Sequence, residues 1–176
     1  MNMKLIGSMS LVIFLVGCST GKTSNEYIKE SETERWHVDQ NGTFKVQGLS
    51  NNHTPTSLWA RMYIRENLTV GVAVELPLSN CTNFSKLVIS KEKTSWNGRI
   101  IPTNLQCLSK GIALLYPSTK LGSQLVLKEF REEFVVEFRI KSNNPKSTIF
   151  SAYNFQNLEN NFNKYALEKM RELQRL

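Results

Sequence analysis

The stretch LWARMYIRENLTVGVAVEL, residues 58–76, gives the clearest indication of the fold, because apolar residues recur in it at every second position. The apolar positions are Leu58, Ala60, Met62 and Ile64 in its first half, and Leu68, Val70, Val72, Val74 and Leu76 in its second half. Side chains alternate between the two faces of a strand, so this period of two predicts a pair of half-buried β-strands.

Similar patterns extend from this pair in both directions along the chain. Further strands are expected at residues 36–40, 43–49, 86–90, 111–116, 134–140 and 147–153. The Asn41-Gly42 dipeptide predicts a hairpin with a type I′ turn, and Asn97-Gly98 marks a second turn. Residues 51–57, which include Pro55, are expected to form a loop, and residues 121–132 form either a loop or a short helix that Gly122 would weaken.

The period changes near the end of the chain. The apolar residues there recur at intervals of three and four: Phe155, Leu158, Phe162, Tyr165, Ala166, Met170, Leu173 and Leu176. This pattern predicts an amphipathic helix over about residues 155–176. The fold class expected for residues 36–176 is therefore a single, mainly β domain. It is an antiparallel β-sandwich or barrel-like domain of seven to nine strands with a C-terminal amphipathic α-helix.

The first residues have the pattern of an export signal. Lys4 precedes an apolar stretch from Leu5 to Val16, which is too short to span a bilayer. The stretch ends in Leu15-Val16-Gly17-Cys18, which resembles the lipobox of bacterial lipoproteins. This resemblance implies cleavage of residues 1–17 and attachment of diacylglycerol to the thiol of Cys18. Ser19, in place of Asp, then favours the outer membrane, and the polar residues 18–35 would form a flexible tether.

Charge and cysteine content fit an exported protein. The chain carries a formal net charge of +7 and three cysteines. An exported basic protein meets anionic glycans, lipopolysaccharide, lipid head groups or acidic proteins, whereas nucleic acid is not an expected partner. With Cys18 assigned to the lipid, Cys81 and Cys107 form an even pair, which predicts a disulfide bond, with two buried free thiols as the alternative.

The sequence contains no pattern typical of a catalytic or metal site. His37 and His53 are not at metal-ligand spacing, and the G-x-S-x-G pattern of a nucleophile elbow is absent. The charged residues at 129–133 are interpreted as a solvated surface. The expected function is therefore a non-enzymatic binding lipoprotein without a cofactor. It would be accessory to a secretion, conjugation or surface structure, or act as an exclusion or inhibitor factor. The alternative is an envelope hydrolase or a carbohydrate-binding protein.

One predicted strand face has the composition of a binding surface. Trp59, Arg61, Tyr63 and Arg65 alternate with the apolar residues of the same strand and therefore share its other face. Tyr, Trp and Arg are the residues that contribute most to protein interfaces. This face either holds an envelope partner or is covered by other parts of the domain.

The second half of the chain resembles the invasion-associated locus B family of exported bacterial proteins. The resemblance rests on the order of Cys107, a Gly-led apolar strand at 111–113, a short helix at 121–127 and a strand pair at 134–140 and 149–155. The second nearby cysteine that is usual in that family is absent here. The resemblance carries over no functional residue.

Overall fold

The computed structural model describes residues 35–65, 69–85, 88–140 and 147–173. The elements are β1 (His37–Val38), β2 (Phe44–Leu49), β3 (Pro55–Ile64), β4 (Val70–Pro77), β5 (Val88–Trp96), β6 (Arg99–Ser109), β7 (Ile112–Pro117), α2 (Lys120–Glu132), β8 (Val135–Ile140), β9 (Ser147–Ser151) and α3 (Phe155–Leu173). The mainly β class and the C-terminal helix are thus confirmed. The lipobox and the expected tether up to residue 34 lie outside the described residues.

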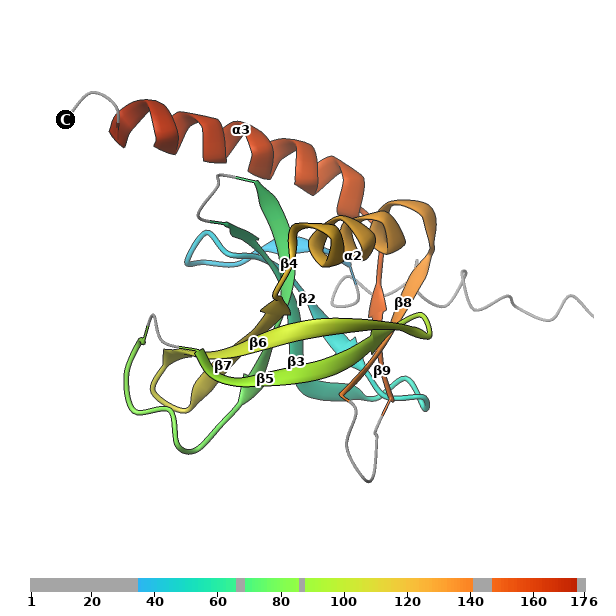
Figure 1. Cartoon of the computed structure of the whole chain (residues 1–176). Coiled ribbons are helices and arrows are strands. Elements are labelled where there is room, and N and C mark those ends of the chain that lie inside the picture. Colours follow the sequence, from blue (N-terminus) through green and yellow to red (C-terminus); the bar gives the residue numbers. More distant parts are fainter. Residues whose placement is uncertain (1–34, 66–68, 86–87, 141–146, 174–176) are drawn as a thin grey trace, which may run out of the picture.

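Eight of the strands close into an antiparallel barrel (Figure 1). Their order around the ring is β2-β3-β4-β7-β6-β5-β8-β9, and β9 pairs with β2 through Phe150 opposite Gly48 and Ile149 opposite Leu49. The short β1 is the additional strand and pairs with β2. Of the two architectures expected, the structure is therefore the barrel. Closure leaves the eight ring strands without a free edge, which removes a site of unwanted strand pairing.

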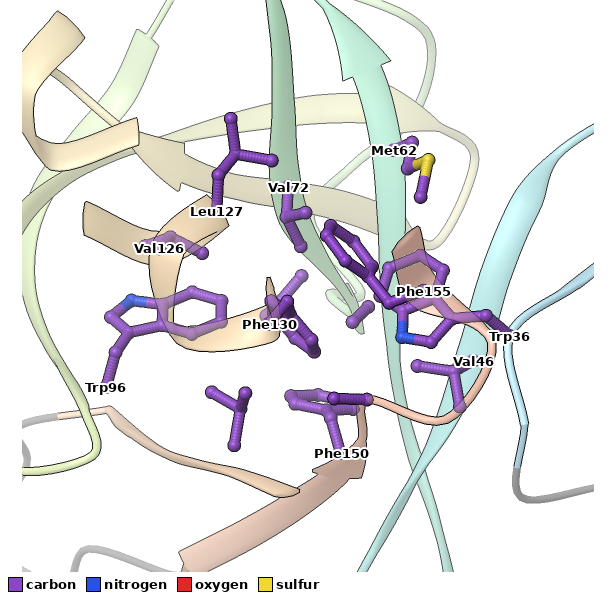
Figure 2. Packing of buried hydrophobic residues seen from close by; sticks show 14 of the residues in the cluster. Trp36, Val46, Met62, Val72, Trp96, Val126, Leu127, Phe130, Phe150 and Phe155 are labelled. Atoms are coloured by element: carbon purple, nitrogen blue, oxygen red, sulfur yellow. The ribbon is translucent and has the colours of Figure 1, made fainter. Parts of the chain in front are cut away.

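Aromatic side chains fill the interior of the barrel and join it to the helices (Figure 2). The ring of Phe130 on α2 lies 5.3 Å from that of Trp36 and 5.1 Å from that of Phe155, measured between centroids. Trp96, Phe138 and Phe150 are also fully buried. Both helices lie together over one end of the barrel (Figure 1). No helix within the described ranges is long and apolar enough to cross a membrane.

The helix over residues 120–132 forms despite Gly122. Thr119 caps its first turn by accepting a hydrogen bond of 3.0 Å from the backbone N–H of Gly122. A Cβ atom at position 122 would lie 2.9 Å from Cγ2 of Ile101, so the close packing of α2 on β6 requires a small residue there. Burial of Val126 and Phe130 therefore outweighs the low helix propensity of glycine.

The first hairpin is confirmed, but the type I′ turn expected at Asn41-Gly42 is wrong. Among the described residues of this turn, Gly42 has a positive φ of 74° and Asn41 does not. The carboxylate of Asp39 accepts the backbone N–H groups of Asn41 and Thr43, both at 2.9 Å, and this side-chain bonding selects a different turn. The second turn matches the type I′ pattern, with φ of 46° at Asn97 and 80° at Gly98.

Several strand bounds differ from those expected. The strand expected at 86–90 corresponds to β5, which begins at Val88 and continues to Trp96, because β6 pairs with it along most of its length. Residues 86 and 87 lie outside the described residues. Pro55 begins β3 instead of lying in a loop, since the first residue of a strand tolerates a missing N–H. The first strand shortens to two residues, β9 ends at Ser151, and α3 is described to Leu173. Residues 174–176, to which the helix was expected to extend, lie outside the described residues.

Candidate binding groove

Three residues of the predicted binding face, Trp59, Arg61 and Tyr63, lie on the outer surface of β3, and Arg65 directly follows this strand. Ala60 and Met62 point into the core, so Trp59, Arg61, Tyr63 and Arg65 point outward by alternation. All four are half-buried. The structure divides them into two pairs with different surroundings.

Trp59 and Arg61 belong to a network that uses their polar and aromatic groups. Nζ of Lys45 lies 4.6 Å from the centroid of the Trp59 ring, and Arg61 forms an ion pair with Glu75 of β4. Lys45 also lies 2.7 Å from a carboxylate oxygen of Asp39, and its hydrogen bond lowers the pKa of Asp39 to about 2. The charges around this pair are therefore largely balanced within the domain.

Tyr63 and Arg65 instead line a groove of about 760 Å³ that crosses the outer face of β3, β7, β6 and β5. Its other polar lining residues are Asn104, Gln106, Tyr116 and Ser118, and its apolar ones are Ile64, Phe84, Val88 and Leu114. A volume of this size lies within the range of about 300–1,000 Å³ that is usual for small-ligand sites.

Strand register explains why residues far apart in sequence meet in the groove. Asn104 is directly opposite Tyr116, and Gln106 is directly opposite Leu114, so these four side chains share one face of β6 and β7. Val88 of β5 extends the second of these rows, because it is opposite Gln106. Antiparallel pairing thus builds the floor of the groove from two rows of side chains.

Small residues on β4 allow the two tyrosines to approach each other. A Cβ atom at Gly71 would lie 2.7 Å from the ring of Tyr63, so this ring lies directly over the backbone of β4. Its centroid is 5.8 Å from that of Tyr116, which belongs to the strand beyond β4. Burial raises the pKa of Tyr63 above its usual value, so the phenol is neutral at physiological pH.

Arg65 ties one end of the groove to the start of α2. Its Nη1 donates a hydrogen bond of 3.0 Å to the carbonyl oxygen of Thr119 and a second one to the hydroxyl of Ser123. These bonds hold the guanidinium at the margin of the groove. Its charge is not balanced by a carboxylate among the described lining residues.

The disulfide between Cys81 and Cys107 stabilises the segment that forms the wall of the groove at the end away from Arg65. The bond is present, with the two Cα atoms 5.4 Å apart, which confirms the prediction of a disulfide. Gly111 donates its backbone N–H to the carbonyl of Cys81 at 2.7 Å, and Nε2 of Gln106 donates to the carbonyl of Ser85 at 2.6 Å. These bonds fix the segment that presents Phe84, whose side chain is 59% exposed.

The charged residues at 129–133 are not all solvated, and that interpretation is wrong for Glu129. Its side chain is only 8% exposed and lies 2.9 Å from Nε of Arg99, while Asn97 donates to its other oxygen at 2.9 Å. Arg131 donates two hydrogen bonds, from Nε and Nη2, to the two carboxylate oxygens of the buried Glu159 of α3. Both carboxylates are thus paired within the fold and join α2 to β6 and to α3.

The described residues contain no group of three or more His, Cys, Asp or Glu side chains that could hold a metal ion. His37 lies on β1, where its ring is 6.2 Å from that of Trp59, and His53 has a φ of 57° in the exposed loop before β3. Neither histidine lines the groove.

Alternation along residues 58–65 predicted Tyr63 and Arg65 as site residues, whereas the other groove residues were not predicted. Tyr116, Asn104 and Gln106 were included in no predicted site, although alternation on β7 gave Tyr116 and Leu114 one common face. The signal that was available is the run Val-Gly-Val-Ala-Val at 70–74, whose small residues at every second position predict close approach of other side chains.

The fold and its groove define the class of the molecule as a closed antiparallel barrel with a mixed polar and apolar groove on its outer face. The structure is similar to the crystal structure of invasion associated protein B from Bartonella henselae, with a TM-score of 0.40 and 12% sequence identity. The similarity covers 83% of this chain and 100% of that one. No family model matches the sequence, and no curated protein matches it.

Proposed function

We propose that this chain is a lipoprotein of the bacterial cell envelope whose barrel binds an envelope component without catalysing a reaction. The lipid on Cys18 would hold the protein in the outer membrane, and residues 19–35 would give the barrel reach into the surrounding space. Two or three acyl chains form a stable anchor, where a single chain gives only marginal binding. Such a protein would be accessory to a secretion, conjugation or surface structure, or would exclude or inhibit an incoming agent.

The groove is the observation that carries the binding half of this proposal. It combines two tyrosine rings, two carboxamides and an arginine in a preformed concave surface. Sites of this kind use apolar and aromatic walls for affinity and a few polar groups for orientation. The described lining residues include no Asp, Glu, His or Cys, so they offer neither a pair of carboxylates nor a nucleophile with a base. This composition favours binding over hydrolysis.

The anchoring half predicts the behaviour of a Cys18→Ala variant. Cells grown with a palmitate analogue should label the wild-type protein, whereas the Cys18→Ala variant should carry no label and remain unprocessed or leave the membrane fraction. Lipidation requires the thiol, and alanine has none. Ser19→Ala is the matched control and should retain the label. Label on the Cys18→Ala protein would contradict the proposed anchor.

The binding half predicts contact between the groove and an envelope component in living cells. A photo-crosslinking residue at Tyr116 should capture such a component. The same residue at Ile149 should not, because β9 lies four positions from β7 in the eight-stranded ring and thus across the barrel.

A further inference from the structure

The described side chains with unpaired charge around the groove are positive. Arg65 lies at one end of the groove, and Lys91 continues the row formed by Asn104 and Tyr116, because Lys91 is directly opposite Asn104 in the pairing of β5 with β6. Lys91 is exposed and shares the outward face of its partner. The carboxylate of Glu75, which is opposite Leu114 on β4, is already in an ion pair with Arg61. An anionic ligand would therefore meet Arg65 in the groove and Lys91 beside it, and it would meet no carboxylate among the described lining residues.

The floor of the groove suits a ligand that is rich in hydroxyl groups. Asn104 and Gln106 lie two residues apart on β6 and so project from the same face. A carboxamide has two N–H donors and an acceptor, which match the neighbouring donors and acceptors of sugar hydroxyls. One N–H of Gln106 is already bonded to the carbonyl of Ser85, so Gln106 offers its other N–H and its carbonyl oxygen. The tilted rings of Tyr63 and Tyr116 provide apolar surface for the C–H face of a sugar ring, while the hydroxyl of Tyr63 is buried within the fold.

The topology disfavours an extended peptide in the same place. Peptides that lie along a sheet commonly add a strand at a free edge, where unpaired backbone groups form hydrogen bonds to them. Each of the strands beneath the groove is paired on both sides within the closed ring. A ligand in the groove is therefore recognised by side chains alone, which favours a ligand whose own recognition groups are hydroxyls and charges.

We propose that the groove binds a short acidic oligosaccharide of the cell envelope. Arg65 and Lys91 would contact the carboxylates, Asn104 and Gln106 the hydroxyls, and the tyrosine rings the apolar faces of the sugars. This inference rests on the proposed binding function and specifies the chemical class of its ligand.

The test is a titration of the mature chain, residues 18–176, in detergent with a fluorescently labelled hexamer of galacturonic acid. The same hexamer as its methyl ester is the matched neutral probe, and a hexapeptide of glutamic acid is the matched peptide. The acidic sugar should bind, its affinity should fall as NaCl rises, and the methyl ester should bind at least tenfold more weakly because it lacks the charges.

Two variants test whether the acidic sugar binds in the groove. Lys91→Gln and Asn104→Ala should each weaken binding of the acidic sugar by about threefold to tenfold, which corresponds to the loss of one charge-assisted or neutral hydrogen bond. Both positions lie on the barrel surface, and circular dichroism should show unchanged folding. Lys164→Gln, which removes an exposed charge from α3, is the control and should bind as the wild type does.

Three results would overturn the inference: no binding of the acidic sugar, equal binding of the ester, or undiminished binding by both groove variants. If the glutamate peptide alone binds and requires Asn104, the ligand class is wrong while the proposed binding function stands. If the acidic sugar fails and crosslinking at Tyr116 also captures nothing in cells, the binding function itself is wrong.

Discussion

The Phe130→Ala variant should lose about 3–5 kcal/mol of unfolding free energy, the cost typical of removing a buried aromatic side chain from a core. Phe130 is 1% exposed, and its ring contacts Trp36, Trp96 and Phe155. These neighbours come from the start of the domain, from β5 and from α3. The truncated side chain would leave a cavity at the point where α2 joins the barrel to the last helix, and the closed ring has little freedom to collapse around it.

Urea unfolding followed by tryptophan fluorescence measures this loss. Leu121→Ala on the same helix is the matched control, because that side chain is 66% exposed and its truncation should change stability by no more than about 0.5 kcal/mol. Equal effects of the two substitutions would show that α2 does not pack on the barrel as described.

Replacement of both Cys81 and Cys107 by serine should lower the unfolding free energy by about 3.5 kcal/mol. The two cysteines are separated by 26 residues, and the chain-entropy model gives a loop of that length this stabilisation. The loss should also release the segment that presents Phe84, so binding in the groove should weaken more than the loss of stability alone would produce. Both effects follow from the same bond.

Reductant separates this bond from other effects of the substitutions. Dithiothreitol should destabilise the wild-type chain by about 3.5 kcal/mol, the amount assigned to the bond, and leave the double-serine variant unchanged. A wild-type chain with the same urea midpoint in the presence and absence of reductant would contradict a stabilising role of the disulfide.

Local patterns were sufficient to predict most elements of this fold. Alternation along residues 58–76 identified the inward residues of β3 and β4, and the change of period after Phe155 identified the last helix. The pairing of Cys81 with Cys107 followed from counting cysteines in an exported chain. Each of these inferences depends on neighbours in sequence or on composition, and no long-range geometry was needed.

The closure of the sheet and the burial of Glu129 depend on contacts between distant residues. Alternation assigns a face to each residue but does not identify the strand that lies beside it, so the pairing of Gly48 with Phe150 was not predictable. Glu129 looked like one charge in a solvated run, because its partners Asn97 and Arg99 belong to a hairpin about 30 residues earlier.

Only part of the candidate site was predictable, because the rest depends on contacts between residues that are distant in sequence. Tyr63 and Arg65 shared a face with Trp59 and Arg61 by alternation alone, but the network around Arg61 and the groove beside Tyr63 depend on other strands. Tyr116 and Asn104 enter the site through the register of β6 with β7. The lipid anchor at Cys18 rests on the lipobox pattern and stays a prediction.

Photo-crosslinking in living cells tests whether the outer groove is the surface through which this protein binds in the envelope. A benzophenone-bearing residue would replace Tyr116 in one strain and Ile149 in another, and each protein would be isolated after illumination and analysed for adducts of higher mass. We expect adducts from position 116, reduced by the Asn104→Ala substitution, and none above background from position 149. Adducts that form equally at both positions, or at position 149 alone, would contradict the proposed role of the groove.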